Sequence, residues 1–160
     1  MLTKWTVPAA AALILSACGF QLQGRQPLPP QFAYTYVDTE DEQTDFVQDL
    51  RKSLLASKVN VVRTKSSSTA IVSVHDDELT ERILSVSARN IPTEYELTYS
   101  VTFSVTSEGK TLIDKEEISA VRDISFDEAQ LLAKEREQEI LRAALARDLV
   151  GLVMRRLAAL

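Results

Sequence analysis

EYELTYSVTFSVT, the stretch from Glu94 to Thr106, decides the fold of this chain. Apolar and polar residues alternate along it without a break. A period of two over this length predicts a long β-strand with one face buried and one face in water, and no helix fits it. The residues expected on the buried face are Tyr95, Leu97, Tyr99, Val101, Phe103 and Val105.

The flanking segments predict two neighbouring strands. Glu108-Gly109 marks a tight turn, so a return strand is expected over residues 111–121. It mixes apolar and acidic residues, which is typical of an edge strand protected by charge. Upstream, a strand is expected from Ala70 to His75, with a kink or bulge as it continues towards Ala88.

Residues 32–62 predict a strand, a helix and a second strand. Residues 32–37 are aromatic and β-branched, residues 44–57 have apolar side chains at helical spacing, and residues 59–62 include a short apolar run. This order favours a parallel pair of strands with a right-handed crossover. The apolar helix residues are Phe46, Val47, Leu50, Leu54 and Leu55.

A long C-terminal helix is expected over residues 126–158, because Ser125 and Glu128 form a capping box at its start. Its apolar stripe includes Leu141, Leu145, Leu149, Leu152 and Leu157. Two helix stripes and one apolar sheet face must cover each other. The sequence therefore predicts an α+β fold over residues 32–160: a single domain in which two helices pack on one face of a four- to five-stranded, mostly antiparallel sheet.

The N-terminus has the pattern of a lipoprotein signal peptide. Lys4 precedes a short apolar run that ends in Leu15-Ser16-Ala17-Cys18. We expect residues 1–17 to be the signal peptide, Cys18 to be the acylated first residue of the mature chain, and the Pro-rich residues 18–31 to be a tether. The alternative is an ordinary signal peptide, which the Ser-Ala-Cys ending fits poorly.

Composition argues against several classes of function. Cys18 is the only cysteine, so no disulfide forms within the chain. The net charge is −5, or −6 once Lys4 is removed with the signal peptide, which argues against nucleic acid as a partner. No later apolar run approaches the ~20 residues needed to cross a bilayer, so membrane attachment is expected through the N-terminal lipid.

The sequence shows no catalytic constellation. His75 is the only histidine, no serine lies in a Gly-x-Ser-x-Gly motif, and the four glycines form no phosphate-binding loop. We interpret His75 as a surface residue of a strand, and expect no enzyme activity, no metal site and no cofactor. The remaining possibility is a tethered binding or assembly module.

The Ser- and Thr-rich side of the 94–106 strand has two interpretations. It is either the ordinary wet face of an antiparallel sheet, or a face that meets a polar wall such as the inside of a large barrel. Composition is compatible with both.

Three motifs occur in a characteristic order. They are Cys18-Gly19-Phe20-Gln21-Leu22, then Glu94-Tyr95-Glu96-Leu97, then Phe126-Asp127 followed by Leu132-Ala133-Lys134-Glu135 and Glu137-Gln138-Glu139-Ile140. Together with the order of expected elements, they resemble the LptE family of lipopolysaccharide-assembly lipoproteins over essentially the whole mature chain. The chain departs from some members by ending at Leu160 without an extended polar tail.

The resemblance implies a location and partners. Members of this family lie in the outer membrane within the lumen of the β-barrel LptD, which they help to assemble and plug, and they contact lipopolysaccharide. Gly19 after the acylated cysteine is compatible with outer-membrane sorting. By motif position, the family's basic residues linked to lipopolysaccharide map to Arg89 and Lys134, and Arg and Lys donors are suited to lipid A phosphates.

A free periplasmic glycolipid-binding or chaperone lipoprotein is the alternative function, and an envelope-anchored hydrolase is poorly supported. A carrier needs a large apolar groove, whereas a plug needs a closed core and a polar surface. The sequence offers few spare apolar residues to line a groove, which favours the plug.

Overall fold

The computed structural model describes residues 27–125 and 131–160, and the side chains of residues 27–125 and 136–160. The elements are the 3₁₀ turn η1 (Pro30–Phe32), β1 (Tyr34–Asp38), α2 (Asp45–Ala56), β2 (Asn60–Val62), the 3₁₀ turn η2 (Lys65–Ser67), β3 (Ala70–Val86), β4 (Pro92–Ser107), β5 (Lys110–Ser125) and α3 (Leu131–Ala158). The predicted signal peptide, Cys18 and the capping box at Glu128 lie outside the described residues.

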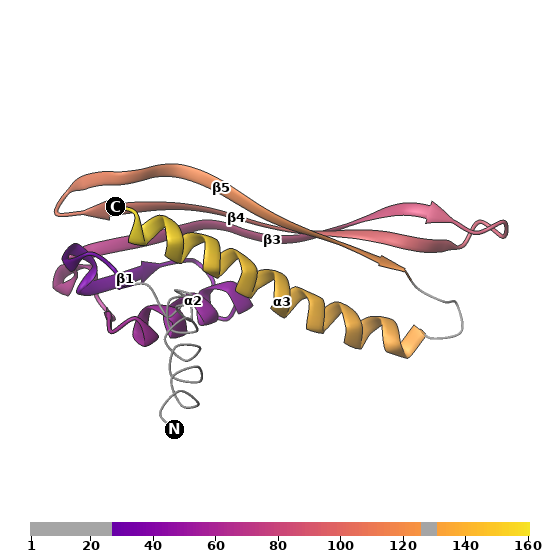
Figure 1. Ribbon diagram of the computed structural model, residues 1–160, viewed down its shortest axis with the longest axis horizontal. Helices are drawn as coiled ribbons and strands as arrows, with labels where there is room; N and C mark the ends of the chain where they lie inside the picture. Colours follow the sequence, from indigo (N-terminus) through magenta and orange to yellow (C-terminus); the bar gives the residue numbers. More distant parts are fainter. Residues whose placement is uncertain (1–26, 126–130) are drawn as a thin grey trace, which may run out of the picture.

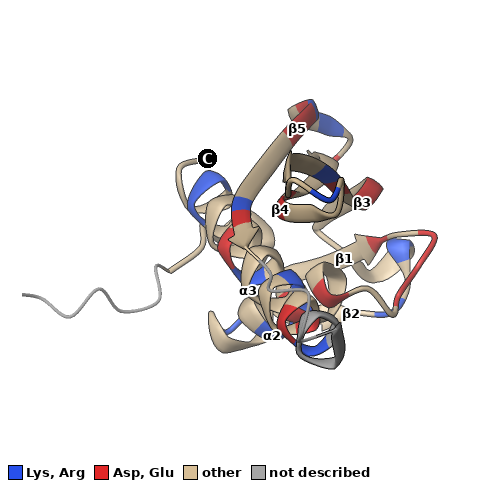
Figure 2. Ribbon diagram, turned by 90° about the vertical axis from the view of Figure 1, so that its right-hand side faces the viewer, with Lys and Arg blue, Asp and Glu red and all other residues tan. Residues whose placement is uncertain are grey.

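The five strands form one mixed sheet in the order β2-β1-β3-β4-β5. The short β1 pairs in parallel with both β2 and β3, while the much longer β3, β4 and β5 pair antiparallel. Helices α2 and α3 lie together on one side of this sheet (Figures 1 and 2). The predicted α+β architecture is confirmed, with the β1–β2 parallel pair and β5 at an edge as expected.

Strand β4 follows the predicted alternation except at Tyr95, which is half-buried and not part of the core. Leu97, Tyr99, Val101, Phe103 and Val105 are buried, whereas the Ser and Thr side chains between them are half-buried on the opposite face. The buried row packs in one core with apolar residues of both helices. The strand extends from Pro92 to Ser107, slightly beyond the alternating stretch.

Helix α2 begins at a side-chain cap, and both helices bury most of the predicted apolar stripe. Thr44 caps α2, its hydroxyl oxygen accepting a hydrogen bond of 3.2 Å from the Val47 amide. Two predicted stripe residues are wrong: Leu55 is 58 % exposed and Leu152 is 37 % exposed. Leu55 directly follows the buried Leu54, and Leu152 directly precedes the buried Val153. Consecutive residues of a helix are about 100° apart around its axis, so these two side chains point away from the core.

A bulge in β3 changes which of its residues face the core. The pairing with β4 shifts between Val74 and Asp76, so His75 is the extra residue. Val74 faces the helices before the shift, and Asp77 and Leu79 pair with buried β4 residues after it. The bulge thereby places a carboxylate on the helix side of the sheet.

Asp77 accepts a short hydrogen bond from the hydroxyl of Tyr99 through Oδ1. Tyr99 is 1 % exposed, and the second carboxylate oxygen of Asp77 is buried without a hydrogen-bond partner. Burial of the ring and, second, the hydrogen bond to Asp77 raise the pKa of Tyr99 above its usual value of 10.0. The neutral phenol is therefore the form that the fold stabilises.

We expect Tyr99→Phe to lower the free energy of unfolding by about 1–2 kcal/mol at pH 7, because Asp77 loses its donor. A raised pKa in the folded state means that the contribution of Tyr99 is complete below about pH 10 and is lost as the pH rises further. Denaturant unfolding between pH 7 and 11 should show a steeper alkaline loss for wild type than for Tyr99→Phe.

The control is Tyr34→Phe, at a tyrosine 48 % exposed to solvent. This variant should retain the alkaline loss of stability seen in wild type. If Tyr99→Phe and wild type lost stability in parallel above pH 10, the assignment of this alkaline loss to Tyr99 would be incorrect.

Two ion pairs attach the edge strand β5 to α3. Arg122 lies 3.2 Å from Asp148, and Glu116 lies 2.9 Å from Arg156. Both β5 residues pair with buried positions of β4, so their side chains are on the helix side of the sheet. Both pairs are partly exposed, and such pairs contribute at most about 1 kcal/mol each. The two ion pairs neutralise the charges that Glu116 and Arg122 of β5 present towards α3.

Candidate ligand-binding and partner-binding surfaces

The β3–β4 hairpin extends beyond the helices at one end of the molecule (Figure 1). Its turn is closed by the Ser87 amide donating to the Ile91 carbonyl at 2.7 Å, and by the Asn90 amide donating to the Ser87 carbonyl at 2.9 Å. Asn90 adopts a left-handed conformation with φ of 60°, which asparagine tolerates. Arg89, the first predicted lipopolysaccharide contact, is exposed in this turn.

Large apolar side chains are exposed around Arg89. The exposed fractions are 53 % for Ile83, 43 % for Leu84, 51 % for Val86 and 38 % for Ile91. Exposed aliphatic side chains on a hairpin that also carries an exposed arginine suit a molecule with both apolar chains and anionic groups. We call Ile83, Leu84, Val86 and Ile91 the apolar tip, and the sequence pattern alone does not predict it.

Lys134, the second predicted contact, lies in the first turn of α3, and its side chain is outside the described part of the chain. Helix α3 begins at the same end of the molecule as the hairpin turn, so Arg89 and the start of α3 share that end (Figure 1). The turn η1, which includes the last two residues of the predicted tether, lies at the other end (Figure 1).

A cleft of about 530 Å³ lies between the sheet and the N-terminal half of α3. Its apolar lining comes from Leu79, Leu97 and Ala143, and its polar lining from Asp45, Glu81, Gln138, Glu139 and Arg142. Four of these polar residues form pairs across the cleft. Arg142 lies 3.1 Å from Asp45, and the Gln138 side chain donates a hydrogen bond to Glu81. A second cleft of about 510 Å³ lies between the start of β5 and the end of α3. Four of its lining residues are charged and four are apolar: Asp114, Lys115, Glu116, Arg156, Leu112, Ile113, Ala159 and Leu160. Neither cleft is an apolar groove suited to acyl chains.

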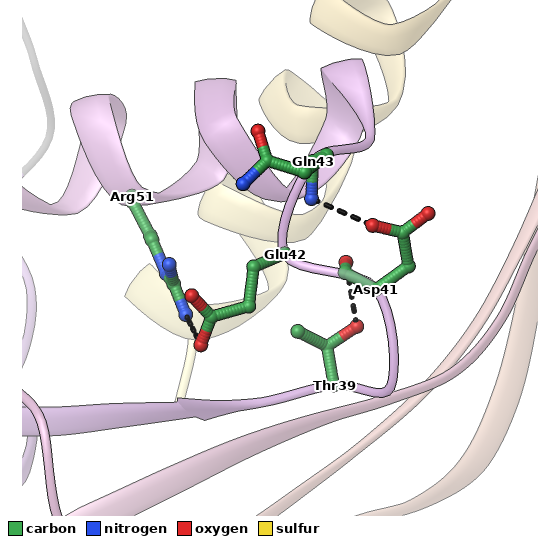
Figure 3. Close-up of polar contacts among 5 residues, drawn as sticks. All are labelled: Thr39, Asp41, Glu42, Gln43 and Arg51. Carbon is green, nitrogen blue, oxygen red and sulfur yellow. Dashed lines mark hydrogen bonds and ion pairs between the residues drawn. The ribbon is translucent and has the colours of Figure 1, made fainter.

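Two of the acidic residues in the loop between β1 and α2, Asp41 and Glu42, form local contacts (Figure 3). The Gln43 amide donates to the Asp41 carboxylate at 2.7 Å, and the Thr39 hydroxyl donates to the Asp41 carbonyl at 3.1 Å. Arg51 lies 3.1 Å from Glu42, and this hydrogen bond and charge lower the pKa of the Glu42 carboxyl. These contacts order the entry into α2, and we assign the loop a structural role.

His75 lies at the β3 bulge and is exposed. Its Nε2 is 2.8 Å from the hydroxyl oxygen of Ser104 on the neighbouring strand β4. Over residues 27–125 and 136–160, no group of three or more His, Cys, Asp and Glu side chains could hold a metal ion. Within the same described part of the chain, neither helix is long and apolar enough to cross a membrane.

The family model for LptE, described as lipopolysaccharide-assembly, matches residues 32–157. The chain belongs to the LptE family. This match covers every described element except the first two residues of η1 and the last residue of α3. The resemblance to this family is thereby confirmed, and the chain is assigned to a family of lipopolysaccharide assembly; the motif at Cys18 lies outside the matched residues.

Three solved structures are similar to this chain. An uncharacterized lipoprotein B from Nitrosomonas europaea is 29 % identical with a TM-score of 0.72, over 88 % of this chain and 91 % of that one. The rare lipoprotein B from Shewanella oneidensis is 25 % identical with a TM-score of 0.70, over 79 % and 94 %. A minor lipoprotein from Acinetobacter baumannii, at 18 % identity and a TM-score of 0.67 over 83 % and 94 %, shares the fold. Among curated proteins, no significant match to the chain was found.

Proposed function

We propose that this LptE-family chain is a lipoprotein of the outer membrane that assembles with and plugs an LptD-type β-barrel, and that it contacts lipopolysaccharide during its insertion at the cell surface. The family match over residues 32–157 carries this proposal. The similarity to bacterial lipoproteins over nearly the whole chain supports the lipid-anchored part of it.

The anchor in this proposal is Cys18, acylated after removal of residues 1–17. Two or more buried acyl chains hold a protein firmly to a bilayer. Residues 18–31 form the tether, and their length keeps the folded part within about 50 Å of the membrane at ~3.5 Å per residue. The domain then faces the periplasm and the barrel lumen, and Gly19 is compatible with outer-membrane sorting.

The hairpin turn is the proposed site of lipopolysaccharide contact. Arg89 supplies a guanidinium for lipid A phosphates, and the apolar tip surrounding it can contact apolar parts of the molecule. Lys134 is the proposed second cation, at the start of α3 on the same end of the molecule. No catalytic role and no cofactor are part of this function.

A free periplasmic glycolipid carrier is less well supported. Such a protein needs a groove that shields acyl chains from water, and the two clefts described above, among residues whose side chains the structure describes, each have charged side chains in their lining. The closed core between the sheet and the helices is what a plug requires.

We expect Arg89→Asp combined with Lys134→Asp to weaken lipopolysaccharide binding by at least tenfold. Two cations are replaced by groups that repel phosphate, so the effect should exceed that of alanine substitutions. Binding of lipopolysaccharide to the purified chain, produced without residues 1–18, should be measured at low and physiological salt, and wild-type affinity should fall as salt rises.

The matched control reverses two exposed cations elsewhere, Arg63→Asp and Lys110→Asp. It changes the net charge equally and should bind nearly as wild type does. A folded Arg89/Lys134 variant with unchanged affinity would remove both residues from the proposed site.

A further inference from the structure

The face of β3, β4 and β5 that points away from α2 and α3 is covered by no element among the described residues (Figure 2). The strand register assigns its rows across the three strands. They are Asp76–Thr102–Glu117, Glu78–Ser100–Ser119, Thr80–Thr98–Val121 and Arg82–Glu96–Asp123. We call these twelve residues the open face.

Charged side chains on the helix side of β5 are ion-paired within the chain, whereas most of those on the open face are not. On the helix side, Glu116 and Arg122 are each ion-paired with α3. On the open face, Glu78, Glu117 and Asp123 form no hydrogen bond or ion pair through their side chains in the described structure. The Asp76 carboxylate accepts only from the amide of its neighbour, Asp77.

The single cation of the open face is already neutralised. Arg82 lies 2.9 Å from Glu96, with a second nitrogen of its guanidinium 3.2 Å from the same oxygen. The open face therefore presents four further carboxylates, those of Asp76, Glu78, Glu117 and Asp123, with no cation of its own to balance them.

The central strand supplies hydroxyls between these carboxylates. Thr98, Ser100 and Thr102 are half-buried in the sheet and can both donate and accept hydrogen bonds. The face is thus a flat surface of acceptors, with an excess of negative charge along its two flanking strands.

The open face is a flat patch on the sheet and not an enclosed pocket. Its four rows cover seven residues of each strand, or about 20 Å at ~3.3 Å per residue, and the three strands span about 10 Å between the outer backbones. With side chains at the edges, the open face is a part of the ~800 Å² that each partner buries in a standard interface, so a protein partner would also contact residues around these rows.

We propose that the open face is the docking surface for the partner barrel, and that the barrel wall opposite it presents Lys, Arg and amide donors. This inference rests on the proposed function and names the contact surface within it. Unpaired carboxylates can be buried at an interface only where the partner supplies cations and donors. The same carboxylates repel phosphate, so anionic lipid is directed to the hairpin turn and not to this face.

The test is co-purification of the barrel with the full-length chain, expressed with Glu78→Lys and Glu117→Lys. Both side chains are exposed and unpaired, so the isolated variant should unfold at nearly the wild-type temperature. We expect at least tenfold less barrel to be retained, because cations would face cations. Glu78→Gln with Glu117→Gln should give an intermediate loss, and it serves as the test should the lysine variant misfold.

The matched control is Glu40→Lys with Glu137→Lys, two exposed acids outside the open face. It should retain the barrel as wild type does. If wild type retains no barrel, the proposed function and this inference both fail. If wild type and the open-face variant retain it equally, or if the control loses it as well, only the docking surface is wrong. A variant that keeps the barrel but binds lipopolysaccharide differently would assign the face to lipid instead.

Discussion

Phe103→Asn is expected to lower the free energy of unfolding by at least 3–5 kcal/mol, enough to abolish cooperative unfolding in a chain of ordinary stability. Phe103 is 0 % exposed and belongs to the core between β4 and the helices. The substitution removes a buried aromatic ring and leaves an amide in an apolar site without partners. Thermal and denaturant melts of the purified chain measure the effect.

Thr102→Asn places the same side chain one residue earlier, on the open face. Thr102 is half-exposed there, so the amide remains in contact with water and the loss of stability should stay below about 1 kcal/mol. Equal damage from both variants would show that the alternation along β4 does not separate a buried from an open face.

Cys18→Ala is expected to eliminate acylation entirely, because Cys18 is the only thiol in the chain and the proposed attachment point of the lipid. The precursor should retain residues 1–17, since the lipoprotein-specific peptidase requires the modified cysteine. Metabolic labelling with a radioactive fatty acid and the mass of the purified chain report these two effects.

Gly19→Ala is the matched control, because it alters the next residue and leaves the thiol in place. It should incorporate label as wild type does. Label that persists in Cys18→Ala would exclude the lipoprotein anchor at this position.

Strand β4 shows how far periodicity alone reaches. Side chains alternate between the two faces of any strand, so the buried row from Leu97 to Val105 follows directly from the sequence. The sequence predicts a kink or bulge in β3 between His75 and Ala88, but not its position or its effect on the register. Its position is set by the pairing with β4, and it exchanges the inward-facing residues from Val74 to Asp77.

The helix stripes were predicted less well at single positions. Leu55 and Leu152 are apolar residues next to the stripe, and a count of leucines does not distinguish them from buried neighbours. Which side of a stripe is covered depends on where the second helix and the sheet lie, since α2 and α3 pack on each other as well as on the strands.

The candidate surfaces follow from the sequence and the three-dimensional structure together. Arg89 was chosen by its match to a family motif, and the structure places it at a hairpin turn among exposed aliphatic residues. The apolar tip was not predicted, because Ile83 and Val86 lie in an ordinary strand pattern. They are exposed because the hairpin extends beyond the helices, which only the three-dimensional arrangement shows (Figure 1).

The charge pattern of the open face likewise requires the register. Glu116 and Glu117 are adjacent in sequence, and the sequence predicts only that they point to opposite faces. The structure pairs Glu116 with Arg156 of α3 and leaves Glu117 unpaired on the open face. The contrast between the two glutamates distinguishes a face that is satisfied within the chain from one that is available to a partner.

The central claim is that this LptE-family chain functions as the lipid-anchored partner of an outer-membrane barrel. The most direct test is to isolate the full-length, tagged chain from outer membranes in mild detergent and to measure the mass and molar ratio of what accompanies it. We predict one β-barrel protein of several times its mass, in a one-to-one ratio. A chain that elutes alone from the outer membrane, or that fractionates away from that membrane, would contradict the account.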